Sequence, residues 1–162
     1  MGYDLYFANL TDDDHQELGR ISEDALVGND DDPGGAMYAV YDALRSTGVY
    51  ERCGVHIMHT YCEELRAQGA GKLADALWGF QNLDPDIILD QLAGVAIIPT
   101  RPPDHEHVAP FETLVADHLG AHLGTARPDI ASMDERKWAL HWSRFLDFLV
   151  RAAVIGDGVE VA

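Results

Sequence analysis

Lysine is scarce in this sequence, and long hydrophobic runs do not occur in it. Lys72 and Lys137 are the only lysines, and 28 acidic residues against 11 basic ones leave a formal net charge of −17 over 162 residues. Such a field repels phosphate groups, so we expect neither nucleic acid nor an anionic membrane surface as a partner. Because no stretch reaches the roughly 20 apolar residues of a membrane span, we expect no transmembrane helix.

Cysteine is equally rare, since Cys53 and Cys62 are the only two. The surrounding pattern predicts that both lie on one helix, about 13 Å apart along its axis. A disulfide needs Cα atoms within about 7 Å of each other, so we expect two free thiols in the core. Residues 1–10 contain no Lys or Arg, which is unlike the start of a signal peptide. Together these observations predict a cytoplasmic protein.

Catalytic motifs are missing as well. The chain contains no GxSxG, no HExxH and no CxxC pair. The segment Gly69–Lys72 (GAGK) ends in Gly-Lys as a P-loop does, but the residues before it do not have the spacing of that motif. The carboxylates of Glu63 and Glu64 beside Cys62 would raise the pKa of its thiol, which argues against a thiolate nucleophile. The sequence therefore favours a non-enzymatic protein without a cofactor.

Helical periodicity dominates what is present. Apolar spacing and capping signals predict helices over residues 12–27, 36–46, 50–67, 72–81, from 85 onward, 110–123 and from about 133 to 155. The last helix starts with a capping-box pattern, Ser132 and Glu135, and has an inward stripe of Trp138, Trp142, Phe145, Leu149 and Ala152.

Strand patterns are confined to short segments. Tyr3–Phe7 and Val159–Val161 alternate in polarity, and their pairing is the simplest way to satisfy both backbones. Val95–Ile98 is a brief apolar run that suits a buried strand. We therefore predict a mainly α (α+β) fold, a single domain over residues 1–162 with about six to seven helices and a small sheet from the N- and C-terminal strands.

Histidines provide the main alternative to a purely protein-binding role. His118 and His122 are spaced i, i+4 on the helix predicted over 110–123, which is a usual way to present two imidazoles to one metal ion. His105 and His107 lie in the proline-rich connector that precedes it. These four residues could hold a divalent transition metal, although histidines on a half-buried stripe also suit hydrogen-bonded core positions.

A second histidine pair, His56 and His59, lies between Cys53 and Cys62. Side chains three residues apart on a helix differ in direction by about 60°, so the four positions spread too widely to close on one ion. His56 and His59 would need a second group of histidines, brought near by helix packing, to form a site.

Two aspartate triplets carry the densest charge. Asp12–Asp14 follows Thr11, a predicted N-cap, where negative charge stabilises the start of a helix. Asp30, Asp31 and Asp32 lie in a Gly/Pro loop and have no such structural reason. The loop lacks the spacing and the closing Glu of a calcium-binding EF-hand. We therefore expect Asp30–Asp32 to be the first contact with a basic protein partner.

Parts of the chain resemble the uncharacterised YfbM-like family of small bacterial proteins. The similar segments cover about half of the chain, and they are the opening MGYDLYFANLTDDDHQEL, residues 84–94 with the following Ile97-Ile98-Pro99, and the ending FLDFLVRAAVIGDGVEVA. The resemblance implies a helical domain with terminal strands and implies no activity. The opening GYDLYF is also similar to the start of several small immunity proteins of bacterial toxin systems.

The function that these features favour is a non-enzymatic acidic binding protein, of the immunity or regulatory type, that holds a basic protein partner. The same acidity would also suit solubility in a salt-rich cytoplasm. The first alternative is a small metal-binding protein or metalloenzyme that uses His118 and His122. The second is a scaffold role as a homodimer, suggested by three Trp residues in so acidic a chain.

Overall fold

The computed structural model describes residues 2–28, 33–100 and 135–162 of the chain. This part is mainly helical with a small antiparallel sheet, which confirms the predicted mainly α (α+β) class. Its elements in chain order are β1 (Gly2–Phe7), α1 (Asp12–Val27), α2 (Pro33–Arg45), β2 (Tyr50–Gly54), α3 (Val55–Ala67), α4 (Gly71–Trp78), α5 (Pro85–Leu92), α7 (Glu135–Ile155) and β3 (Val159–Val161).

The sheet has the strand order β2-β1-β3, with β1 in the middle and antiparallel to both neighbours. Leu5 lies opposite Glu51 of β2 and opposite Val161 of β3. The N–H and C=O of Asp4 bond to Ala162 at 2.9 and 2.8 Å, so the end of the chain is held against its beginning. The predicted pairing of the terminal strands is therefore confirmed.

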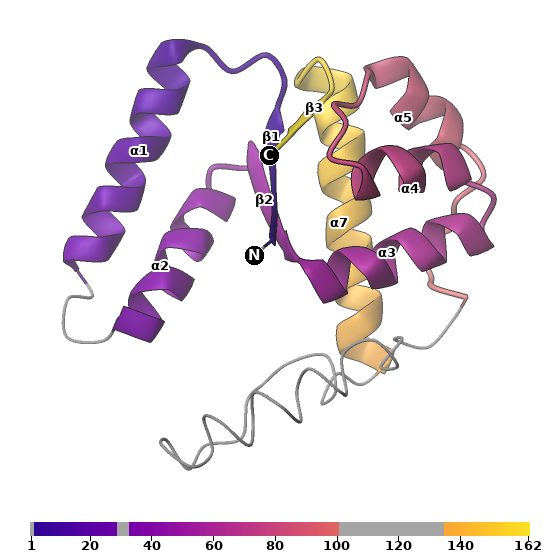
Figure 1. Cartoon of the computed structure of the whole chain (residues 1–162), viewed down its shortest axis with the longest axis horizontal. Coiled ribbons are helices and arrows are strands. Elements are labelled where there is room, and N and C mark those ends of the chain that lie inside the picture. The colour runs from indigo at the N-terminus through magenta and orange to yellow at the C-terminus, as the bar shows by residue number, and fades with distance from the viewer. Residues whose placement is uncertain (1, 29–32, 101–134) are drawn as a thin grey trace.

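Helices cover the sheet on both faces (Figure 1). α1 and α2 lie on one side, and α3, α4, α5 and α7 lie on the other. The alternation along β1 accounts for this arrangement, since Tyr3, Leu5 and Phe7 belong to the large core under α3, α4 and α7. Tyr6 points the other way and packs against the smaller cluster formed with α1 and α2.

The α1–α2 layer is held by a small apolar cluster and a capped helix start. Leu18 of α1 is buried with Val40 and Leu44 of α2. At the start of α1, the Asp14 N–H donates to the Thr11 hydroxyl and the Thr11 N–H donates to the Asp14 carboxylate. This reciprocal capping box confirms Thr11 as the N-cap and satisfies two backbone donors that would otherwise lack partners.

The large core is built on α7. The predicted inward stripe is confirmed, because Trp138, Trp142, Phe145, Leu149 and Ala152 are all buried. The Tyr61 ring of α3 stacks on Phe145 with ring centroids 4.1 Å apart. Aromatic packing of this kind adds to the stabilisation from burial alone.

One predicted helix is partly wrong, because residues Tyr50–Gly54 form strand β2 and the helix begins only at Val55. Tyr50 and Cys53 are buried on opposite faces of the sheet, so this segment alternates like a strand. Gly54 has an extended backbone and is the N-cap of α3. Cys53 and Cys62 therefore lie on different elements, although both are free, buried thiols as predicted.

The predicted strand over Val95–Ile98 is also wrong. These residues have no strand structure, and Ile97 and Ile98 are 68% and 76% exposed. The Ala96 backbone bonds to side chains instead of to a neighbouring strand: its N–H donates to Gln68 Oε1 at 2.6 Å, and its carbonyl accepts from Trp142 Nε1 at 3.0 Å.

A tight turn at Gly158 brings β3 to the sheet. Gly158 has φ +105°, and a Cβ there would overlap the carbonyl oxygen of Leu83. This close approach permits the paired bonds between Leu83 and Val159, at 2.8 and 2.9 Å. Only glycine combines this backbone conformation with this contact.

We predict that Gly158→Ala lowers the free energy of unfolding by about 2 kcal/mol or more, through backbone strain and the clash with Leu83. Gly19→Ala is the matched control, because Gly19 lies in helix α1 with no atom within 4 Å of its Cβ position. That control should stabilise the protein by about 0.5–1 kcal/mol. Urea unfolding of both variants measures the difference, and equal midpoints would contradict this account of the turn.

Candidate functional site

A buried carboxylate, Glu51, lies at the free edge of the sheet. β2 is an edge strand, and the N–H and C=O of Arg52 point away from β1 because Asp4, its opposite residue, bonds to β3. The Arg52 N–H donates to Glu51 Oε1 at 3.0 Å, and the Arg52 carbonyl accepts from Arg45 Nη2 at 3.0 Å. These side chains occupy the edge where another strand would otherwise bind.

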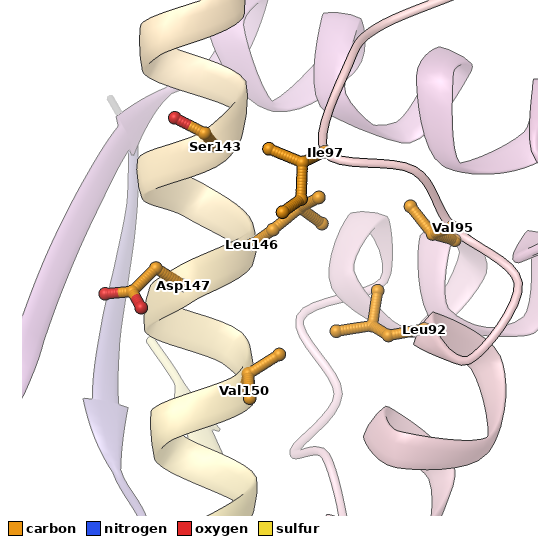
Figure 2. A pocket seen from close by; sticks show the side chains of 7 residues that line it. All are labelled: Leu92, Val95, Ile97, Ser143, Leu146, Asp147 and Val150. Atoms are coloured by element: carbon orange, nitrogen blue, oxygen red, sulfur yellow. The ribbon is translucent and has the colours of Figure 1, made fainter.

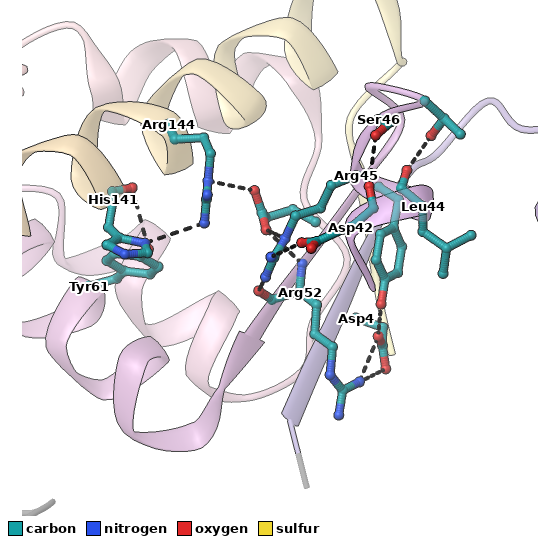
Figure 3. A network of polar contacts seen from close by, with 12 residues as sticks. Asp4, Asp42, Leu44, Arg45, Ser46, Arg52, Tyr61, His141 and Arg144 are labelled. Atoms are coloured by element: carbon teal, nitrogen blue, oxygen red, sulfur yellow. Dashed lines mark hydrogen bonds and ion pairs between the residues drawn. The ribbon is translucent and has the colours of Figure 1, made fainter. Parts of the chain in front are cut away.

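Glu51 also joins helices from both faces of the sheet, through Arg45 and Arg144, which Figure 3 shows. The Glu51 side chain is 6% exposed, and Arg45 Nε at the end of α2 donates to Oε1 at 2.7 Å. Arg144 Nε of α7 lies 3.5 Å from Oε2. Because a carboxylate loses its hydration on burial, these donors are what make its charge tolerable there.

A second ion pair ties β1, β2 and α2 together. The Asp4 carboxylate accepts from Arg52 Nη1 at 2.7 Å and from the Tyr50 hydroxyl at 2.6 Å. The Arg52 guanidinium lies over the Tyr41 ring, 4.5 Å from its centroid. Burial, and then the bond to Asp4, raise the pKa of Tyr50 far above its ordinary value, so its hydroxyl remains a donor.

His141 completes this network on α7. Its half-buried ring accepts from Arg144 Nη2 at 3.3 Å through Nδ1, which requires a neutral imidazole. Burial, and then the charge of Arg144, lower the pKa of His141 below the ordinary 6.5. All the acidic groups of the network are bonded to structural donors, so we interpret it as a set of cross-links between elements.

The described residues also form one apolar pocket, which we call the α7 groove (Figure 2). Its volume is about 250 Å³, and it lies between α7 and the segment that follows α5. The residues that line it are Leu92, Val95, Ile97, Ser143, Leu146, Asp147 and Val150. The apolar side chains point into the space, whereas the oxygens of Ser143 and Asp147 lie along the outer edge of α7.

Buried polar contacts hold one wall of the α7 groove in place. Glu64 of α3 is 1% exposed and accepts from Gln68 Nε2 and from the N–H and hydroxyl of Thr100. Gln68 accepts a hydrogen bond from the N–H of Ala96, and Trp142 donates one to the carbonyl of Ala96. The segment 95–100 is thus fixed to both α3 and α7.

Neither cysteine is suited to nucleophilic chemistry. Burial raises the pKa of the Cys62 thiol to about 12, with a further contribution from Glu63 that the sequence predicted. Burial also raises the pKa of Cys53 far above its ordinary value, and Glu51 adds to that effect. Both residues therefore remain protonated thiols near neutral pH.

The residues predicted as metal ligands and as partner contacts lie outside the described part of the chain. They are His105, His107, His118 and His122 for the metal, and Asp30, Asp31 and Asp32 for the partner. Of the other histidines, His59 packs edge-on against Trp78 with centroids 5.7 Å apart. Within residues 2–28, 33–100 and 135–162, no three His, Cys, Asp or Glu side chains are grouped to hold a metal ion.

Sequence reasoning missed both Glu51 and the α7 groove. Glu51 was assigned to a helix, and in so acidic a chain no signal marks one carboxylate as buried. The groove is missed because the sequence predicts a buried strand over Val95–Ile98, which would place Ile97 inside the protein. The order Ile97-Ile98-Pro99 a few residues after a helix is the available signal, since proline lacks the N–H that strand pairing needs.

No protein-family model, curated protein or solved structure matches this chain in the three comparisons. The similarity to YfbM-like proteins therefore stays a prediction from the segments quoted above. In the residues that the structure describes, no helix is both long and apolar enough to cross a membrane.

We predict that Glu51→Ala lowers the free energy of unfolding by about 2 kcal/mol, because Arg45 and Arg144 lose their shared acceptor and the edge N–H loses its partner. The value is below that of a fully buried pair because these arginine side chains are 29% and 47% exposed. Thermal unfolding should show a decrease of about 4–8 °C in Tm.

Glu17→Ala is the control for this substitution. Glu17 pairs with Arg20 on the exposed surface of α1, where ion pairs contribute little to stability. The Tm of the Glu17→Ala variant should not differ measurably from that of the wild type. Equal effects of the two substitutions would show that Glu51 is no more than another surface acid.

We also predict that His141 titrates below pH 6.5 in the folded protein, and that Arg144→Gln raises its midpoint by removing a lowering charge. Because the folded pKa is below the unfolded one, neutral His141 contributes stability that is complete above the unfolded pKa. That stability is lost as the pH falls through the folded pKa. NMR titration of the imidazole resonances measures both midpoints, and a wild-type midpoint at or above 6.5 would overturn the assignment.

Proposed function

We propose that this chain is a non-enzymatic binding protein whose acidic surface holds a basic protein partner, as an immunity or regulatory protein does. The observation that carries the proposal is the outer face of α1. All of its acidic residues are exposed, and they are Asp12, Asp13, Asp14, Glu17, Glu23 and Asp24. Six acidic residues and one arginine leave this helix with a charge of −5.

The apolar side of α1 explains why these carboxylates face outward. Leu18 is buried against α2, and Ile21 and Ala25 pack against the same cluster. The opposite side of the helix is left for charged residues, and α1 lies at the edge of the molecule in Figure 1. Asp30–Asp32 follow α1 in the sequence after Gly28 and Asn29, and they add three acidic residues to this region of the chain.

The basic residues of the described part do not form a competing positive patch. Arg20 pairs with Glu17 and Asp24, and Arg66 pairs with Glu63 and Asp75. Arg45, Arg52 and Arg144 are bonded to acids of the buried network. These five arginines thus neutralise acidic neighbours, and the long-range field of the protein remains negative.

A cytoplasmic location is part of the proposal. Cys53 and Cys62 are both free, and free buried thiols suit a reducing compartment. The acidic surface would then speed the encounter with a basic partner through electrostatic attraction.

The proposal predicts that much less partner co-purifies with the triple variant Asp12→Asn, Asp13→Asn, Glu23→Gln than with the wild type. The control variant Asp42→Asn, Asp75→Asn, Glu160→Gln removes as many charges from scattered exposed positions and should retain it. Wild-type capture should also fall steeply between about 0.1 M and about 1 M salt, where the Debye length shortens from about 10 Å to about 3 Å. A partner held equally by both variants and at both salt concentrations would refute the proposal.

A further inference from the structure

The α7 groove lies on an exposed face of α7 that carries further apolar side chains. Leu140 and Val154 are 70% and 66% exposed, and they share this face with Val150 and with the polar Ser143 and Asp147, at helical spacings of three and four residues. The facing wall adds Ile97, which is 68% exposed. Apolar side chains gathered around a preformed cavity are typical of a surface that binds another molecule.

The size and shape of the α7 groove suit side chains of a helix. Its volume of about 250 Å³ is below the roughly 300–1,000 Å³ of pockets for small molecules, and it has room for one or two anchoring side chains. Ser143 to Val150 extends over about 10 Å of α7, or two turns. Anchors at i and i+3 or i+4 of a docked helix would fit this length.

The charge around the α7 groove is of one sign. Among the residues that line it, Asp147 is the only charged one, and its carboxylate lies on the outer side of α7, beside the cavity rather than in it. Arg144 and Arg151 of α7 are directed toward the sheet, since Arg144 reaches Glu51 and Arg151 lies over the Phe7 ring. An occupant therefore meets apolar walls with an acidic edge.

We propose that the α7 groove binds an amphipathic helix of a basic protein, with apolar anchors in the cavity and Lys or Arg beside Asp147. The inference rests on the proposed function, because it identifies the part of the basic partner that the chain recognises. A second copy of this chain is disfavoured as the occupant, since it would bring acidic edges and two charges of −17 together. The wall fixed by Glu64, Gln68 and Trp142 is already formed, which lowers the ordering cost of binding.

The test uses two synthetic peptide helices with the same Leu residues at i, i+3, i+4 and i+7, one with Lys and one with Glu on the polar face. Fluorescence anisotropy with the full chain should show the Lys peptide binding at least about tenfold more tightly than the Glu peptide. Val150→Asp and Ile97→Asp should each lower the affinity for the Lys peptide by about tenfold or more, although both substitutions add negative charge.

Val27→Asp is the matched control, because Val27 is 73% exposed at the end of α1, on the other side of the sheet. It should bind the Lys peptide like the wild type. Ile97 is more exposed than Val150, so Ile97→Asp tests the groove even if Val150→Asp fails to fold. Circular dichroism establishes which variants are folded.

Several results would overturn the groove proposal. Equal binding of both peptides, or equal effects of Ile97→Asp and Val27→Asp, would remove the groove as a basic-helix site. A dimer that Ile97→Asp dissociates would identify a second copy as the occupant. Absence of binding of either peptide to the full chain would also overturn it. Failure of the acidic-surface proposal is distinguishable, because it appears as partner capture that the α1 variant does not change while the peptide results stand.

Discussion

The central strand β1 is the constraint on which the rest of the structure depends. It bonds to β2 on one side and to β3 on the other, so the first and last residues of the fold must meet. Since its side chains alternate, one face needs the large core and the other needs α1 and α2. A sheet this small is not stable alone, and its helices supply the apolar surface that holds it.

Two buried carboxylates, Glu51 and Glu64, connect elements that the strand pairing of β1 does not hold together. Glu51 links α2, the edge strand and α7, and Glu64 links α3 to the segment before residue 101. Both lie at places where backbone groups would otherwise lack partners. The cost of burying each charge is offset by several donors, and the result is a fixed relation between helices. Removing such a group affects geometry as well as stability.

Strongly periodic elements could be predicted from the sequence, and context-dependent ones could not. The apolar stripe of α7, the Thr11 cap and the terminal strand pair follow from local patterns. The sequence predicts a helix over β2, because its five residues carry too little periodicity to show that β1 pairs with them. The exposure of Ile97 depends on side-chain bonds from Gln68 and Trp142, which are far away in sequence. The predicted ligands His118 and His122 fall outside the described residues.

The proposed functions of this protein lie on its surfaces, whereas its buried polar groups hold the elements together. The acidic face of α1 and the α7 groove lie on opposite sides of the sheet (Figure 1), so a partner would use either one or reach around an end of the sheet. Hydrogen exchange of the chain bound to its co-purified basic partner tests this division most directly. We expect new protection in α1 and at the groove residues of α5–α7, with the Glu51 network unchanged. Protection confined to the network around Glu51, with α1 and the groove unaffected, would contradict the account.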